Sequence, residues 1–244
     1  MRVDILALQK FYASPLGEVA RAAAVRRLSA AWESVSGLDL LGYGYATPYL
    51  PAFLGSARRV VSLMPAEQGV ERWPTVGASS SALVEEARLP LMDSVFDRVL
   101  LVHALEECEA PRRLLREIWR VMAPEGRLVV IAANRAGLWA LRERTPFGHG
   151  RPYSRTQLSA LLSDCMFEPL ATARALYTPP IDLPALASLS DGLERAGGAV
   201  MPAFGGLILM EAVKRLEAVP ARPTVRSAPQ QAVVAKPVLP KRRL

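Results

Sequence analysis

The chain is poor in the residues that build metal centres and disulfide frameworks. Its 244 residues include two cysteines, Cys108 and Cys165, and two histidines, His103 and His149. The cysteines have neither the number nor the spacing of a disulfide scaffold or a zinc site, and two histidines are too few for a histidine-based metal centre. We therefore expect a protein of the reducing cytoplasm that binds no metal.

Long apolar runs are missing as well. No stretch of roughly 18 consecutive apolar residues occurs, so no membrane span is expected. The first ten residues mix charged and apolar side chains, unlike a secretory signal. At 244 residues, of which 51% are apolar, the chain can form one sizeable domain with a well-buried core. No internal repeat is visible in the sequence.

The positive charge is unevenly distributed. The net charge is +7, but residues 217–244 contain six basic residues and one acid, which leaves +2 on the rest of the chain. This segment also has five prolines and no aromatic residue, so we expect a disordered tail. Such a tail could contact RNA, acidic lipid or an acidic protein partner, or act as a solubilising extension. We favour the last alternative, and the nearly neutral body argues against nucleic acid as a partner.

Apolar runs alternate with amphipathic stretches along the body of the chain. This alternation predicts an α/β fold: a doubly wound, mostly parallel Rossmann-like sheet with right-handed crossovers. We expect N-terminal helices in 1–36, the sheet domain in 37–216 and the tail in 217–244. Strands are predicted at 38–41, 59–63, 81–84, 96–102, 127–133, 167–177 and 205–213, and helices at 4–35 (broken near 14–17), 47–54, 111–122, 154–165 and 184–196.

The first strand runs into Gly42-x-Gly44-x-Ala46, and a helical pattern follows. Small residues at the end of a strand allow the backbone to approach a ligand closely. In an open α/β sheet, this corner is a common ligand-binding position. A two-glycine turn can equally be only a tight connection between strand and helix, and the motif by itself leaves both interpretations open.

The middle of the chain carries a longer pattern. It comprises Leu89-Pro90-Leu91, Asp93, Phe96-Asp97, His103-Ala-Leu-Glu-Glu107 and the run Leu114-Leu-Arg-Glu-Ile-Trp-Arg-Val-Met-Ala-Pro-Glu-Gly-Arg-Leu-Val-Val130. In type, order and spacing these residues resemble the class I S-adenosylmethionine-dependent methyltransferases, in their small-molecule, type 11-like branch. With the flanking strands, the resemblance covers about residues 37–213.

The resemblance implies S-adenosylmethionine as cofactor. The residues it assigns to cofactor binding are Gly42, Gly44, Ala46, Glu67, Glu85, Glu86, Leu89 and His103. Two acids of the family pattern are replaced, by Leu40 before the first glycine and by Met64 at the end of the second strand. Asp39 is next to Leu40, but alternation along a strand turns it to the opposite side. Glu67 is the acid predicted to reach back toward the ribose.

The acceptor side of the resemblance falls on residues 134–153, which follow the strand at 127–133. Arginines suit carboxylates or phosphates, and aromatic rings close over an apolar body. We expect Arg135, Trp139, Phe147 and Arg151 to bind a small, anionic substrate, although an ordered lid is an equal alternative. His149 is the first candidate for a general base because its pKa lies near neutrality. His103 is the second catalytic candidate, and Tyr153 is a further one.

Three functions remain open from the sequence. The first is methyl transfer to a small molecule, which the glycines, His103 and the arginine-rich acceptor segment favour. Residues 134–154 also resemble a group of bacterial methyltransferase-like proteins without a settled substrate. The second is a catalytically inactive methyltransferase-fold subunit that binds or regulates a protein partner, which Leu40 and Met64 favour. The third, RNA methylation that uses the basic tail, has the least support.

Overall fold

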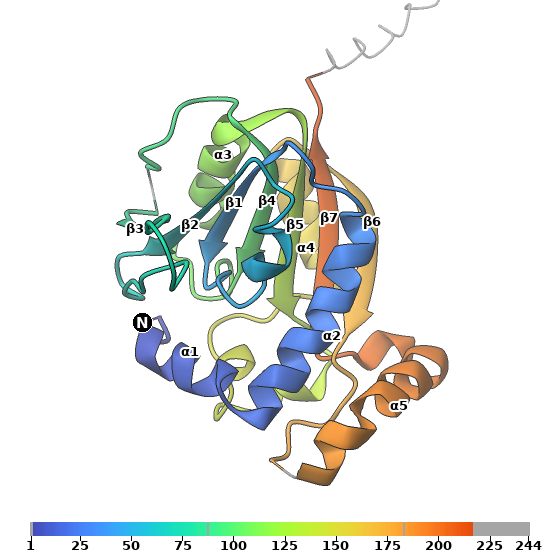
Figure 1. Cartoon of the computed structure of the whole chain (residues 1–244). Coiled ribbons are helices and arrows are strands. Elements are labelled where there is room, and N and C mark those ends of the chain that lie inside the picture. The colour runs from blue at the N-terminus through green and yellow to red at the C-terminus, as the bar shows by residue number, and fades with distance from the viewer. Residues whose placement is uncertain (1, 87, 183, 217–244) are drawn as a thin grey trace, which may run out of the picture.

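A single seven-stranded sheet forms the centre of the molecule (Figure 1). The computed structural model describes residues 2–86, 88–182 and 184–216. The strand order is β3-β2-β1-β4-β5-β7-β6, and β7 runs antiparallel to both of its neighbours. The strands are β1 (Asp39–Gly44), β2 (Arg59–Pro65), β3 (Ser81–Val84), β4 (Phe96–Val102), β5 (Met122–Ala133), β6 (Phe167–Ala175) and β7 (Leu207–Lys214).

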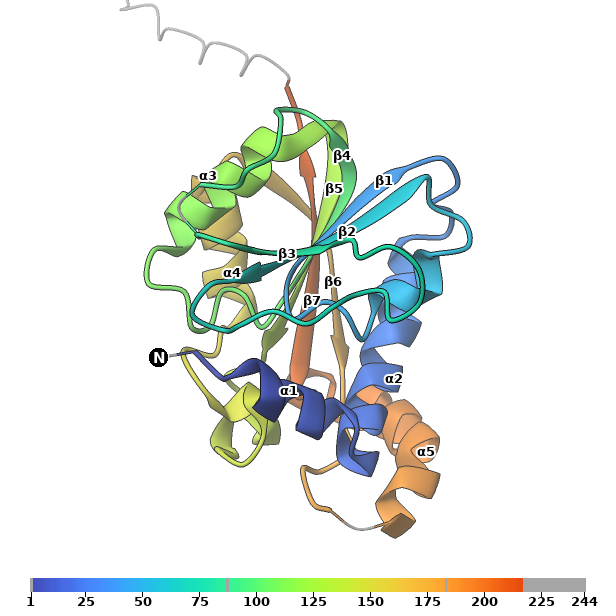
Figure 2. The ribbon, with the colours of Figure 1, turned by 60° about the vertical axis from the view of Figure 1, so that its left-hand side comes forward.

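Helices cover both faces of the sheet, as the alternating sequence pattern predicts. Figure 2 shows α3 (Pro111–Val121) and α4 (Arg155–Asp164) on one face and α2 (Pro15–Ala31) on the other, with α5 (Pro184–Val200) beside it. The short helix α1 (Ile5–Tyr12) lies across one end of the sheet. The prediction of a doubly wound, mostly parallel sheet with N-terminal helices is confirmed.

The β4 strand shows why the sheet is buried on both sides. Leu100 and Val102 pack into the cluster under α2, and Val99 and Leu101 pack into the cluster under α3 and α4. Each of these side chains is fully buried. The unbroken apolar run of the sequence is therefore the expected signature of a central parallel strand.

The segment after β1 differs from the prediction. A helix over 47–54 was expected, but the chain forms only a 3-10 turn, η1 (Leu50–Phe53). Pro51 falls inside this turn and Pro48 precedes it, and proline lacks the N–H that a longer helix requires. The face that a full helix would cover is covered in part by α2, which packs on β6 and β7 (Figure 1).

Helix and strand ends follow local chemistry. A capping box of Ser154 and Gln157 begins α4, and Ser14 caps α2 ahead of Pro15. β1 continues through Gly44 rather than ending at 41, and α5 continues to Val200 rather than 196. The predicted tail, 217–244, lies outside the described residues. Among the helices that the structure describes, none has the length and apolar character needed to cross a bilayer.

Candidate active site

The carboxyl ends of β1, β2 and β4 meet at one edge of the sheet because these strands are parallel neighbours. In Figure 1, α1 lies just beyond this edge. The start of α1 and the residues before it are tied to the same edge: the Val3 N–H donates to the Glu107 carboxylate at 2.9 Å, and the Ile5 N–H donates to the Gln68 carbonyl at 2.8 Å. The first residues of the chain therefore lie over the predicted cofactor side.

The glycine corner is packed tightly onto β4. Gly44 has a φ of +82°, and a Cβ at this position would lie 2.1 Å from the Val102 carbonyl oxygen. The next N–H, of Tyr45, donates to that same oxygen at 2.8 Å. Only glycine satisfies both the positive φ and the close approach. The requirement at Gly44 therefore comes from backbone packing, and the Tyr45 N–H is already paired.

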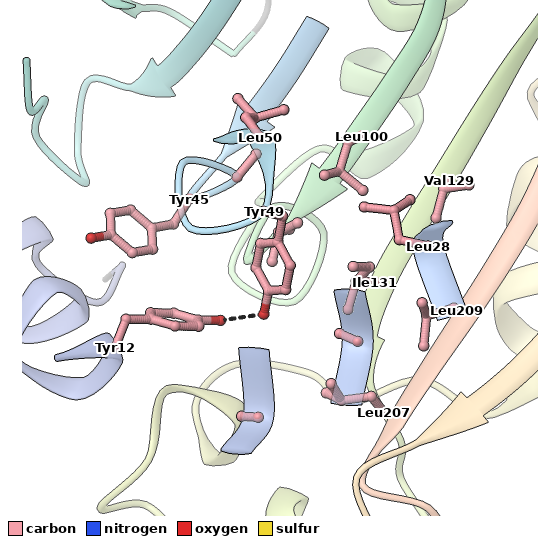
Figure 3. Close-up of a cluster of buried hydrophobic side chains, with 14 of the residues drawn as sticks. Tyr12, Leu28, Tyr45, Tyr49, Leu50, Leu100, Val129, Ile131, Leu207 and Leu209 are labelled. Carbon is pink, nitrogen blue, oxygen red and sulfur yellow. Dashed lines mark hydrogen bonds between the residues drawn. The ribbon is translucent and has the colours of Figure 1, made fainter. Parts of the chain in front are cut away.

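Three hydrogen-bonded side chains meet beside the glycine corner. The Tyr12 hydroxyl lies 2.8 Å from the Tyr49 hydroxyl and 2.8 Å from His103 Nε2 (Figure 3 draws the first contact). His103 has a φ of +48°, and its ring stacks on Phe147 with 4.7 Å between centroids. Burial lowers the pKa of His103 to about 3. The imidazole is therefore neutral at pH 7, so it can position another group by a hydrogen bond but contributes no positive charge.

The Asp39 carboxylate makes its hydrogen bonds at the other end of β1, away from this cluster. It accepts hydrogen bonds from Arg58 at 2.9 Å and 2.7 Å and from Arg59 at 2.9 Å. The hydrogen bonds from Arg58 are the main reason that its pKa lies below the usual range. Asp39 therefore fastens the start of β1 to the start of β2 and does not replace the acid missing at Leu40.

Glu71, which sequence reasoning missed, lies where the missing β2 acid would be expected. Its N–H donates to the Met64 sulfur at 3.4 Å. Its carboxylate accepts hydrogen bonds from Thr47 Oγ1 and, at 3.3 Å, from the Tyr45 hydroxyl, both at the glycine corner, and at 2.7 Å from Gln9 Nε2 of α1. The loop between β2 and β3 thus folds back and brings a carboxylate to the end of β1. Glu67, the predicted substitute, is exposed.

Glu86 and Arg2 form an ion pair at the adjacent part of the edge. The Arg2 guanidinium is buried and also donates to the carbonyls of His103 and Ala104, at 3.3 Å and 3.2 Å. Glu85 is exposed, and the Leu89 side chain packs in the core below α3. Of the two acids predicted on the adenine side, Glu86 is the one that faces the loop after β4.

Glu106, an acid of the loop after β4, is buried. One of its oxygens accepts the Ala133 N–H at 2.9 Å, and the other, Oε2, has no hydrogen-bond partner among the described residues. Burial raises the pKa of Glu106. The motif His103-Ala-Leu-Glu-Glu107 contains this residue, but the sequence does not show which of its two glutamates points inward.

The predicted acceptor residues divide into two groups. Trp139 and Phe147 are fully buried, with their rings 5.8 Å apart, and the Trp139 indole N–H donates to the Thr178 carbonyl. They pack with Phe11 of α1, so they belong to the hydrophobic core. Buried aromatic side chains therefore anchor the 134–153 segment. For this part of the segment, the packing favours an ordered lid over a substrate-binding surface.

The second group lines a hollow of about 610 Å³ between the start of α3 and α4. It contains Arg135, Arg151 and Tyr153, with Arg112 and Asp164 paired at its rim. The Arg151 N–H donates to the Glu106 carbonyl at 2.8 Å, and the Tyr153 hydroxyl donates to the Leu105 carbonyl at 3.3 Å. The hollow therefore borders the loop after β4. His149 is exposed beside it.

The strand order and the antiparallel β7 together define the class I methyltransferase fold. The comparison with protein families agrees: residues 38–130 match the family described as "Methyltransferase domain". The matched span includes the glycine corner, the Leu-Pro turn and the His103 loop, so this part of the chain carries a methyltransferase domain. A search of curated proteins finds no match.

Solved structures share the fold at low identity. A SAM-dependent methyltransferase from Thermotoga maritima aligns with a TM-score of 0.61 at 15% identity, covering 85% of this chain and 94% of its own. An S-adenosylmethionine-dependent methyltransferase from Mesorhizobium loti aligns with a TM-score of 0.56 at 16% identity, covering 78% of this chain and 95% of its own. The Burkholderia thailandensis 1,6-didemethyltoxoflavin-N1-methyltransferase was solved with 1,6-didemethyltoxoflavin and S-adenosylhomocysteine. It aligns with a TM-score of 0.54 at 18% identity, covering 79% of this chain and 76% of its own.

Proposed function

We propose that this protein is an S-adenosylmethionine-dependent methyltransferase that acts on a small, anionic acceptor. The observation that carries the proposal is the position of Glu71. Its backbone N–H donates to the Met64 sulfur of β2, and its carboxylate accepts hydrogen bonds from Thr47 and Tyr45 at the end of β1 and from Gln9 of α1. A carboxylate in this place suits the two ribose hydroxyls, which are strong donors to a charged acceptor.

The remaining polar groups also fit the cofactor. Glu86 faces the loop after β4 on the adenine side, and Glu106 has a buried oxygen without a partner among the described residues. A buried carboxylate oxygen that lacks a partner is costly, so a ligand that donates a hydrogen bond there is favoured. When bound, S-adenosylmethionine supplies an electrophilic methyl group, and the protein's task is to align the acceptor with it.

The acceptor proposal uses the hollow that holds Arg135, Arg151 and Tyr153. Two arginines in its lining suit a carboxylate or phosphate. The hollow borders the loop that carries His103 and Glu106, because residues 151 and 153 hydrogen-bond to residues 106 and 105 of that loop. Of the predicted bases, His149 is the one that remains exposed, since His103 is buried and neutral.

A second candidate function is that of a catalytically inactive subunit with the methyltransferase fold. The contacts of the first residues favour it. Arg2 is buried against Glu86 and the loop after β4, and Tyr12 occupies the hydrogen-bonding positions of His103 and Tyr49. A cofactor that uses these groups must first displace the chain's own side chains.

Isothermal titration calorimetry with S-adenosylmethionine and S-adenosylhomocysteine separates the two functions. The enzyme proposal expects saturable binding of both compounds to the wild-type chain. It also expects Arg2→Ala to bind them at least as tightly, because the variant removes a competing contact with Glu86. No binding to either protein at millimolar ligand would support the inactive subunit.

The acceptor is tested separately in the same assay format. With S-adenosylhomocysteine bound, small carboxylates and phosphates are titrated into the wild type, Arg151→Gln and Arg113→Gln. The last is a control, because Arg113 is an exposed arginine on the outer part of α3. Anion binding that Arg151→Gln weakens and Arg113→Gln leaves unchanged supports the hollow as acceptor site.

A further inference from the structure

A second hollow lies at the opposite end of the sheet from the glycine corner. It has a volume of about 680 Å³ and is formed between the last turns of α2, the residues that follow it, and the sheet face formed by β4, β5, β7 and β6. Its floor includes Arg98, near the beginning of β4, and Arg127, the register partner of Arg98 on β5. Because parallel strands begin at the edge opposite to the one where they end, this hollow is separate from the proposed methyl-transfer site.

Two arginines stand side by side on this floor. Arg98 of β4 and Arg127 of β5 are register partners, so their backbones are about 4.8 Å apart. By strand alternation, Arg98 lies on the same sheet face as Leu100, and Arg127 on the same face as Val129. Leu100 and Val129 both pack in the cluster under α2. Two positive charges therefore point into the same space, where each makes the charged form of the other less favourable.

The counter-charges around this pair are incomplete. The Arg127 guanidinium pairs with Glu211 of β7 at 3.1 Å. Arg98 donates to the carbonyl of its neighbour Asp97 at 2.9 Å, and its buried Nε has no partner among the described residues. Burial, followed by the neighbouring charge of Arg127, lowers the pKa of Arg98. Among the residues that the structure describes, no carboxylate contacts Arg98, which is thus a partly buried cation without a direct counter-charge.

The charges that face the hollow from every wall leave it positive. The lining contributes three cations, Arg27, Arg98 and Arg127, against two acids, Glu33 and Glu211. The carboxyl end of α2 adds partial negative charge, about half an elementary charge at most. The sum still favours an anion, and the guanidinium fork suits a planar carboxylate better than a point charge.

The rest of the lining is apolar with one unused donor. Trp32, Val129 and Leu209 line the hollow, and Trp32 is 4% exposed. The Trp32 indole Nε1 is buried and has no hydrogen-bond partner among the described residues. A ligand with an apolar body and one acidic group can cover the aromatic and aliphatic wall while it accepts hydrogen bonds.

We propose that this hollow is a second ligand site, which binds a small organic carboxylate with an apolar body. The carboxylate lies against Arg98 and Arg127, and the body lies against Trp32 and Leu209. The site does not depend on methyl transfer, since none of its residues belongs to the proposed cofactor or acceptor site.

The test uses benzoate as the probe and benzamide as its uncharged counterpart, with the full-length chain and nuclear magnetic resonance of the indole N–H groups. The chain has four tryptophans, and Trp32→Phe assigns the signal of Trp32 by its loss. Benzoate is expected to shift the Trp32 signal in a saturable way, whereas benzamide binds about ten-fold more weakly or not at all, because it lacks the charge-assisted hydrogen bonds.

Two variants and one control complete the test. Arg98→Gln is expected to weaken benzoate binding about ten-fold or more. Ala173→Leu narrows the hollow without a change in charge and is expected to abolish binding, which keeps the test decisive if Arg98→Gln does not fold. Arg113→Gln removes an exposed arginine elsewhere and should bind like the wild type. Equal binding of benzoate and benzamide, or a benzoate affinity that Arg98→Gln and Ala173→Leu leave unchanged, overturns the proposal.

Discussion

Gly44→Ala is expected to destabilise the protein strongly, because Gly44 holds the glycine corner against β4. The residue has a φ of +82°, and the added Cβ would lie 2.1 Å from the Val102 carbonyl oxygen. The left-handed conformation costs about 1–2 kcal/mol for a non-glycine residue. Overpacking against backbone that cannot move freely adds about 1–3 kcal/mol. The expected loss in the free energy of unfolding is the sum of the two effects, about 2–5 kcal/mol.

Two other glycines separate these contributions. Gly37 has a φ of +72° but no atom within 4 Å of an added Cβ, so Gly37→Ala should lose only the conformational part, about 1–2 kcal/mol. Gly55 has open space and no positive φ, so Gly55→Ala should be neutral or stabilising by about 0.4–1 kcal/mol.

Urea unfolding followed by circular dichroism measures all three variants against the wild type. The expected order of stability is Gly55→Ala, then Gly37→Ala, then Gly44→Ala. If Gly44→Ala costs no more than Gly37→Ala, the glycine corner does not touch the end of β4 as described. The reasoning about the closed corner would then be refuted.

Three further predictions concern the core, the buried histidine and the tail. Trp139→Ala should lower the free energy of unfolding by about 3–5 kcal/mol in the same urea assay, because Trp139 is a core residue, and a variant as stable as the wild type would contradict this. His103 has a pKa of about 3 instead of 6.5, so the unfolded chain binds its proton more readily; stability should therefore fall as pH drops from 6.5 toward 3, in the wild type and in an exposed control, His149→Asn, but less steeply in His103→Asn. Removal of residues 217–244 should leave the urea midpoint unchanged, and a lower midpoint would show that the tail is part of the folded domain.

The fold was predictable because its signals are local. The run Phe96–Val102 is apolar on both faces, and such a run in an alternating pattern has few alternatives to a central parallel strand. Ser154 with Gln157 predicts the start of α4 by side-chain chemistry alone. The prediction of a helix over 47–54 was wrong because it gave too little weight to Pro48 and Pro51, whose backbone nitrogens cannot donate hydrogen bonds.

The site was less predictable because it depends on long-range contacts. Glu71 reaches the end of β1 through the path of the 66–80 loop, and no spacing rule in the sequence expresses that path. Arg2 is about a hundred residues from the carbonyls to which it donates. Trp139 and Phe147 have the residue types of a binding surface, but burial against α1 makes them core residues. Residue type suggests chemistry, whereas the fold decides which side chains meet.

The most direct test of the methyltransferase proposal is the affinity for S-adenosylhomocysteine of Glu71→Gln compared with that of Glu67→Gln. Both variants remove one carboxylate from the same loop region, but Glu71 contacts Thr47 and Tyr45 whereas Glu67 is exposed. Calorimetry should show binding that Glu71→Gln weakens about ten-fold or more and Glu67→Gln leaves unchanged. Equal affinities of Glu71→Gln and the wild type, or no binding to the wild type at millimolar ligand, would contradict the account.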